Sequence, residues 1–274
     1  MISIPRRGLL GIALFCSGLS ASSYAAEPYT LDGKDLTFSR QQIAAKDPLF
    51  VQAQAALQKK ADLALKHPLF SVMDKTLVAA SGDKHDYYSF PPYWWPNPDT
   101  KDGLPYIRKD GQTNPDANSD ATDKNRLVKM SNDVSTLALA WYFTQDNRYA
   151  QKAAAQLKSW FIDPQTRMNP NLQYAQAIPG INTGRGIGII DSRALVEVVD
   201  AIALLQSSEA LNENDVSALK QWFGEYYQWM TTSQNGFEED NWHNNHGSYF
   251  DMQAATFALF SGKTDEAKQR LYIT

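Results

Sequence analysis

The densest group of side chains that could do chemistry lies near the end of the chain, between Asn241 and Phe250. This segment reads Asn-Trp-His-Asn-Asn-His-Gly-Ser-Tyr-Phe, and so combines two histidines, three asparagines and three aromatic rings. It stands at the entrance to a predicted helix, where unpaired N–H groups and the positive end of the helix dipole favour an anion. The segment is therefore a candidate site, and the plain alternative is an elaborate helix cap made by Asn245 or His246.

A metal or cofactor site is not expected from the motifs. His243 and His246 have a spacing of i, i+3, but zinc needs further ligands, and the only cysteine is Cys16. The glycines Gly184-x-Gly186-x-Gly188 lack the strand context and spacing of a phosphate loop. The sequence thus predicts neither a metal nor a cofactor.

Aromatic residues make up 12% of the chain and include seven tryptophans. Trp141, Trp160, Trp222 and Trp229 fall within helical patterns, which predicts that they belong to the core. A second group lies in a region rich in Pro, Gly, Asp and Asn; it consists of Tyr93, Trp94, Trp95 and Tyr106. These rings are either platforms for sugar rings or anchors that hold the loop on the helices.

The elements that must position these residues are predicted to be helices. Helical patterns cover about 47–66, 69–80, 132–145, 147–162, 191–207 and 213–232, and a last pair starts near 247 and turns at 261–263. Regions 81–131 and 163–190 lack periodicity and are expected to be long functional loops. A weak internal repeat relates Phe143 to Phe260 and Ala150 to Ala267, because the two pairs are separated by the same number of residues. Repeated helical hairpins predict an all-α fold, an (α/α) toroid or incomplete barrel with long aromatic loops.

The N-terminus and the charge limit where the protein works. Residues 1–25 read as a signal peptide with Arg6 and Arg7, a short apolar run and a small-x-small cleavage pattern after Ala25. We therefore expect a periplasmic or secreted protein whose domain covers 26–274. With 26 Lys+Arg and 30 Asp+Glu the formal charge is −4, which argues against a nucleic-acid partner, and no later segment is apolar enough to predict a membrane partner.

Three motifs together resemble the alginate lyase superfamily of helical polysaccharide lyases. The first is Asn244-Asn245-His246 followed by Ser248-Tyr249. The second is the aromatic loop from Phe90 to Pro98 with Gly103-Leu104-Pro105-Tyr106, and the third runs from Asn182-Thr183-Gly184-Arg185-Gly186 to Asp191-Ser192. The resemblance covers most of about 80–260 and is closer to the alginate lyase-like branch, which includes glucuronan-acting members.

The resemblance implies β-elimination on an anionic uronic-acid polysaccharide. Asn182, Asn245 and His246 are then the candidates that bind the substrate carboxylate, and His246 could instead be the general base. A tyrosine commonly serves as acid or base in such proteins, and Tyr249 is the nearest candidate by motif. The residues expected to bind substrate are Arg185, Tyr93, Trp94, Trp95, Tyr106, Trp242, His243 and Glu239.

Two further interpretations remain open at this point. Family members usually place a further Arg and a catalytic Tyr well downstream of the Asn-Asn-His motif, whereas this sequence ends at Thr274. We therefore expect a C-terminally truncated chain, either active or reduced to carbohydrate binding. The rival enzyme is a toroid glycoside hydrolase in which Glu239 or Asp240 works with Asp191, although Glu238 to Asp240 also fits a solvated acidic turn.

Overall fold

The protein is predominantly helical, as predicted. The computed structural model describes residues 27–273, so the predicted signal peptide lies outside the described residues. The α-helices are α1 (Gly33–Ala44), α2 (Pro48–Ala64), α3 (Lys124–Thr144), α4 (Asn147–Leu157), α5 (Leu195–Leu205), α6 (Glu213–Thr232), α7 (Gln234–Asp240), α8 (Asn245–Phe260) and α9 (Thr264–Ile273). The shorter elements are η1 (Val72–Asp74), β1 (Trp94–Trp95), β2 (Ile107–Arg108), η2 (Pro115–Asn118), η3 (Lys158–Ile162) and η4 (Gly186–Ser192).

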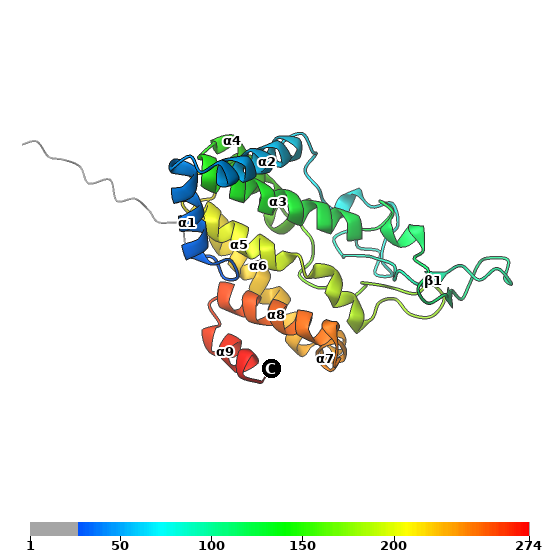
Figure 1. Ribbon diagram of the computed structural model, residues 1–274. Helices are drawn as coiled ribbons and strands as arrows, with labels where there is room; N and C mark the ends of the chain where they lie inside the picture. Colours follow the sequence, from blue (N-terminus) through cyan, green and yellow to red (C-terminus); the bar gives the residue numbers. More distant parts are fainter. Residues whose placement is uncertain (1–26, 274) are drawn as a thin grey trace, which may run out of the picture.

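The long helices are arranged as consecutive hairpins (Figure 1). α3 packs against α5 and α5 packs against α8, so that these three helices form one row. α4 packs on α3, its continuation η3 packs against α6, and both α6 and α9 pack on α8. α2 covers α3 at the N-terminal end of the row. This is the arrangement expected of an incomplete α/α toroid, and it confirms the all-α fold.

The weak internal repeat has a structural counterpart. Phe143 lies near the end of α3 as Phe260 ends α8, and Ala150 lies in α4 as Ala267 lies in α9. Phe260, Ala150 and Ala267 are all buried in the core. The repeated residues therefore occupy corresponding places in the first and last hairpins.

The helix predicted at 69–80 is wrong. Only the single turn η1 forms there, and it is capped by Ser71, whose hydroxyl accepts the N–H of Met73 at 3.0 Å. The backbone becomes extended at Lys75 because the ammonium of Lys75 is drawn into the protein. Two short helices were not predicted: α1, which buries no residue, and α7, which contains the acidic residues expected to form a turn.

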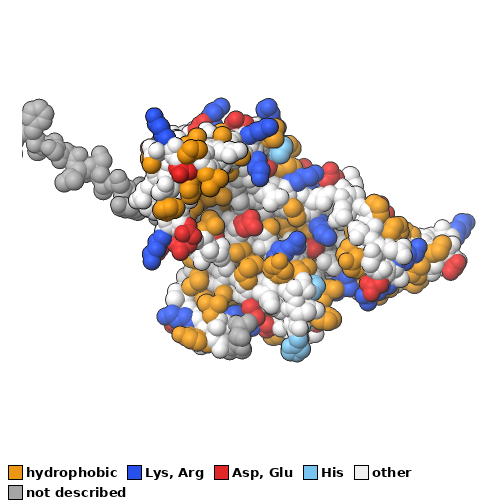
Figure 2. Space-filling model, in the orientation of Figure 1, with side chains coloured by type: hydrophobic (Ala, Val, Ile, Leu, Met, Phe, Trp, Pro, Cys, Tyr) orange, Lys and Arg blue, Asp and Glu red, His pale blue; other side chains and the backbone are white. Residues whose placement is uncertain are grey.

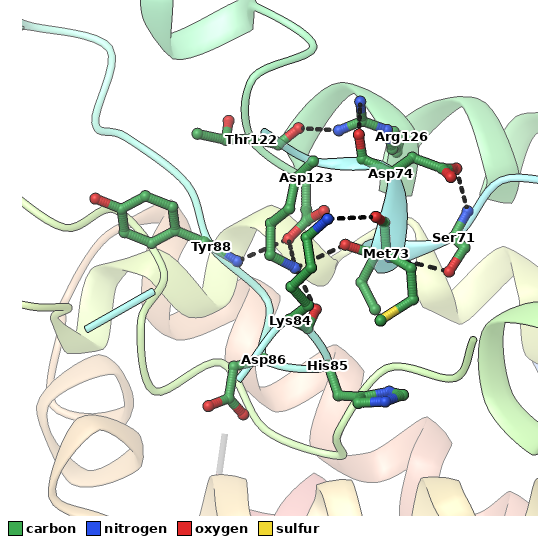
Figure 3. A network of polar contacts seen from close by, with 12 residues as sticks. Ser71, Met73, Asp74, Lys84, His85, Asp86, Tyr88, Thr122, Asp123 and Arg126 are labelled. Carbon is green, nitrogen blue, oxygen red and sulfur yellow. Dashed lines mark hydrogen bonds and ion pairs between the residues drawn. The ribbon is translucent and has the colours of Figure 1, made fainter. Parts of the chain in front are cut away.

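A buried ion pair fixes the long loop that precedes α3 (Figure 3). Lys75 Nζ lies 2.9 Å from Asp123 Oδ2, and neither side chain is exposed. Lys75 also donates to the carbonyls of Val72 and Lys84, while Asp123 Oδ2 accepts the N–H of Tyr88 at 3.0 Å. Burial raises the pKa of Asp123 to about 6 despite the opposing charge of Lys75. The pair thereby holds the segment from Lys84 to Tyr88 against the start of α3.

The tryptophans divide as the helical patterns predicted. Trp141, Trp160 and Trp222 are buried in the core, and Trp229 is partly buried against it. The loop rings lie instead around the small hairpin, in which Trp94 pairs with Arg108 and Trp95 with Ile107.

The surface is chemically mixed. Figure 2 shows acidic and basic side chains interspersed on the face that it presents, with apolar side chains gathered over α1 and α2. Among the exposed apolar residues of these two helices are Phe38, Leu49 and Leu63. A search of the described residues found no helix with the length and apolar character needed to cross a membrane.

Candidate active site

The site is built where η4, α7 and the start of α8 meet, and glycines make this approach possible. A Cβ on Gly186 would lie 2.5 Å from the carbonyl oxygen of Asn235, so only glycine lets η4 approach α7 this closely. A Cβ on Gly247 would lie 2.1 Å from the carbonyl oxygen of Trp242, so the first turn of α8 also needs glycine to lie against the segment that follows α7. These two contacts bring the Arg185, Glu239 and His246 regions together.

His246 is held by a buried acid. Its Nδ1 lies 2.8 Å from Oε1 of Glu239, and the Glu239 side chain is only 1% exposed. Burial, followed by the charge of Asp191, raises the pKa of Glu239 to about 8. Burial and the charge of Arg185 lower the pKa of His246, so the imidazole is neutral at neutral pH. The contact leaves Nε2 as the ring nitrogen available to a ligand.

A second buried acid, Asp191 in η4, organises the other side of the site. It accepts hydrogen bonds from Ser89 Oγ at 2.7 Å, Tyr87 OH at 3.2 Å and Gln176 Nε2 at 3.0 Å. The side-chain amide oxygen of Gln176, Oε1, accepts in turn a hydrogen bond from Arg185 Nη2 at 3.0 Å. Gln176 therefore links the buried carboxylate to the guanidinium without bringing the two charges into contact.

Arg185 is the cation of this site. Burial lowers its pKa, and its Nε is buried with no hydrogen-bond partner among residues 27–273. The residue as a whole is half-buried and borders an open pocket of about 480 Å³. The pocket is lined by Arg185, Gly186, Ile187, Glu238, Asn241 and Trp242.

The three remaining catalytic candidates lie on the same elements or close to them. The side-chain carbonyl of Asn182 accepts the N–H of Ile178 at 3.0 Å, which leaves its NH₂ group as the free donor. Asn245 is exposed in the first turn of α8, and the helix cap expected of Asn245 or His246 is made by Asn244, which accepts the N–H of His246. Tyr249 follows His246 by three residues on α8, so both face the same side of the helix.

The candidate substrate-binding residues are placed unequally. Trp242 is 47% exposed and borders the Arg185 pocket, and with exposed His243 it borders a neighbouring pocket at the start of α8. Glu239 requires a correction, because its full burial leaves it no surface for a substrate and it contacts His246 instead.

The loop rings are partly exposed and form part of the hairpin structure. Trp95 donates its indole N–H to the carbonyl of Gln112 at 3.0 Å and lies under Lys109, so it anchors the loop. Tyr93 is 38% exposed, while Trp94 and Tyr106 are half-buried. The N–H of Tyr106 donates to the carbonyl of Pro179, which ties the hairpin to the loop that carries Asn182.

Sequence reasoning missed Gln176 and the structural role of Asp191. Gln176 lies in an aperiodic loop, and its two partners are specified only by tertiary packing. The sequence suggests for Asp191 the role of a hydrolase acid, but at 3% exposure it is a buried acceptor of three hydrogen bonds. Within the described residues, no group of three His, Cys, Asp or Glu side chains could hold a metal ion.

The helical hairpins thus bring an imidazole, a guanidinium and amides together between η4, α7 and the start of α8. A sequence profile of the alginate lyase family matches residues 71–271, and the chain belongs to this family. It is also similar to the crystal structure of an alginate lyase from Bacteroides ovatus, with 44% sequence identity and a TM-score of 0.86. That similarity covers 90% of this chain and 64% of the other, so the chain spans less than two thirds of that relative. A search of curated proteins found no match.

Proposed function

We propose that the protein is a polysaccharide lyase that cleaves a uronic-acid polymer by β-elimination. Membership of the alginate lyase family supports this reaction class. The observation that carries the proposal is the combination of Arg185, a half-buried cation that lines a pocket, with neutral His246, whose Nε2 is left for a ligand. A carboxylate held by such donors can accept the negative charge that develops when the neighbouring carbon loses its proton.

The reaction assigns a role to each neighbouring group. A base removes the proton from C5, the electron pair of that bond forms the C4=C5 double bond, and the bond from C4 to O4 breaks while O4 takes up a proton. Arg185 and the amide of Asn182 or Asn245 neutralise the carboxylate on C5. Tyr249, one helical turn from His246, is the candidate for proton transfer to or from the sugar.

The substrate we propose is an anionic polymer of the alginate or glucuronan type. A uronate in every residue of the polymer provides the carboxylate that this chemistry requires. The exposed rings Trp242 and Tyr93 offer flat apolar faces for neighbouring sugar units. The glycoside hydrolase alternative is not supported, because Asp191, which it needs beside either Glu239 or Asp240, is buried and engaged inside the protein, and Glu239 is buried as well.

One assay tests the reaction and separates it from its rivals. The protein is incubated with alginate, glucuronan and hyaluronan, and the ultraviolet absorbance of the unsaturated uronate is followed together with reducing ends. Absorbance that rises with reducing ends on one of these polymers is the expected result. Reducing ends without absorbance would identify a hydrolase, and binding without either signal would identify a carbohydrate-binding protein.

A variant ties the activity to the site. His246→Ala removes the partly exposed imidazole and should lower kcat by about 10²-fold or more, as expected for loss of a group that stabilises the transition state. His67→Ala is the matched control, since His67 is 48% exposed and lies in a different part of the fold. Equal activity of the two variants would contradict the assignment of His246.

We also propose that the protein is exported to the periplasm or secreted. The support is the sequence of residues 1–25, with Arg6 and Arg7 before a short apolar run and a cleavage pattern that ends at Ala25. N-terminal sequencing of the protein from the periplasmic fraction should begin at Ala26. Recovery of the uncleaved chain from the cytoplasm would contradict export.

A further inference from the structure

Glu239 is an unusual acid for this protein because its carboxyl group has few donors around it. Its side chain is fully buried in α7, Oε1 contacts only His246, and Oε2 finds no hydrogen-bond partner in the described part of the chain. A buried carboxylate without donors is costly, since each oxygen has lost its water.

Two other buried acids in the same fold receive several hydrogen-bond donors. Asp191 accepts three hydrogen bonds from side chains. Asp200, 2% exposed on α5, accepts from the N–H groups of Tyr29, Thr30 and Leu31 and from the hydroxyl of Thr30. Glu239 receives none of these backbone or hydroxyl donors, so its surroundings suit a neutral carboxyl group.

The charges that face Glu239 agree with this interpretation. Asp191 of η4 disfavours a negative charge on Glu239. Arg185, which precedes η4, favours that charge, but Nη2 of Arg185 is bound to Gln176. From α6 comes the uncharged phenol of Tyr226, whose pKa burial raises, and from α8 comes His246. The net result is that burial and Asp191 raise the pKa of Glu239 to about 8.

We infer that Glu239 is protonated in the resting protein and donates its proton in a hydrogen bond to Nδ1 of His246. His246 must then carry its own proton on Nε2 and present an N–H donor from the ring nitrogen that does not contact Glu239. Glu239 is thus a positioning residue, which makes His246 a donor to the substrate carboxylate and not a base. This assignment deepens the proposed lyase function and rests on it, because it is the proposed uronate substrate that supplies a carboxylate for the Nε2 donor to bind.

The position of the proton is measured by ¹⁵N NMR of protein labelled in its histidine rings. His246 is assigned by comparison with His246→Gln. At pH 7 we expect Nε2 of His246 to carry the proton and Nδ1 to be unprotonated. As the pH rises past about 8, Glu239 ionises and the proton should move to Nδ1. A proton on Nδ1 at pH 7 would overturn the inference.

Two substitutions separate a donating acid from an ionised one. Glu239→Gln keeps a donor of the same shape, so Nδ1 should stay unprotonated above pH 8 and kcat should remain within about threefold of wild type. Glu239→Ala removes the donor and should lower kcat by about tenfold or more, close to the cost of one buried hydrogen bond. Equal losses in both variants would show that the negative charge was needed and would overturn the inference.

The controls keep the two proposals distinguishable. Glu225→Gln changes an exposed glutamate of α6 and should alter neither the NMR signals nor kcat. If Glu239→Ala does not fold, the wild-type spectrum and Glu239→Gln still decide the outcome. If no polymer is cleaved by the wild type, the lyase function fails, while the proton position is still read from the spectrum.

Discussion

Arg185 depends on a neutral side chain for its orientation. Gln176 donates to Asp191 and accepts from Arg185, so both ends of its amide are used. A carboxylate in direct contact with the guanidinium would compensate the positive charge and weaken its attraction for a substrate. The amide fixes the direction of Arg185 and leaves its charge for the ligand.

Replacing Gln176 should therefore weaken substrate binding. Gln176→Leu removes the acceptor of Arg185 and one donor of Asp191, and KM for the cleaved polymer should rise about tenfold, equivalent to about 1.4 kcal/mol. kcat should change less, because the reacting groups on α8 remain. Steady-state kinetics of the folded variant measure both constants, with the exposed Gln228→Leu as control. An unchanged KM would show that Gln176 does not position Arg185.

The sequence indicates candidate residues for the site more readily than it indicates their contacts. His246 and Arg185 could be named because their motifs are local. The bond from Glu239 to His246 could not, since it depends on the short helix α7, which carries no periodic signal of its own. The contacts of Asp191 with Tyr87 and Ser89 join residues about a hundred positions apart, which only packing brings together.

At the scale of elements, the packing of η4 against α7 sets the distance between the two halves of the site. Gly186→Ala would place a Cβ 2.5 Å from the carbonyl of Asn235 and 2.6 Å from Cβ of Glu238, neither of which is a flexible chain end. The free energy of unfolding should fall by about 1–3 kcal/mol, and activity should fall because α7 carries Glu239.

The test of this packing uses urea unfolding and the lyase assay on the same samples. Gly33→Ala is the control, because a Cβ there meets only ordinary contacts with Glu27, the nearest at 3.5 Å. Loss of stability and activity in Gly186→Ala alone is expected. A Gly186→Ala variant as stable and active as the control would mean that η4 and α7 can separate without effect.

The buried pair of Lys75 and Asp123 makes the second prediction at this scale. Asp123→Asn or Lys75→Met leaves one buried charge uncompensated and should lower the free energy of unfolding by about 3–5 kcal/mol. The double variant Lys75→Met/Asp123→Asn should lose less than the sum of the two single losses, because no lone charge remains. Urea unfolding of all four proteins completes the cycle, and additive losses would show that the two charges do not interact.

The helical pairs could be predicted because each has an apolar face with a clear period. α3, for example, buries Val134, Leu137, Ala138 and Trp141. The segment at 69–80 has apolar residues too, but the buried charge of Lys75 determines its course. A local pattern does not contain that information, because the partner of Lys75 lies 48 residues further on at Asp123.

For the whole molecule, net charge cannot be the source of affinity for a polyanion. The formal charge is −4, and the face in Figure 2 mixes both signs. In the function that we propose, a local site must therefore supply the attraction for the polyanion. In that site the neighbouring acids are either neutral or engaged in hydrogen bonds inside the protein. Glu239 is the acid whose neutral state serves this purpose, and its ionisation should be visible in the stability of the entire fold.

Glu239 should make the free energy of unfolding fall as the pH rises. Its pKa is raised from 4.5 to about 8, so between these values the folded protein keeps a proton that the unfolded chain releases. The stability from this group is fully present below about pH 4.5 and is lost as the pH rises through about 8. Glu239→Gln has no such proton, whereas Asp123 and His246 titrate in both proteins.

The difference between wild type and Glu239→Gln therefore isolates this group. It should fall by at least about 1.4 kcal/mol from pH 4.5 to 8, which corresponds to one unit of pKa shift. Urea unfolding across this range measures it, and Glu225→Gln, which changes an exposed carboxylate, should give a flat difference from wild type. A flat difference for Glu239→Gln as well would mean that Glu239 is as acidic in the folded protein as in the unfolded chain, and His246 would then face a carboxylate.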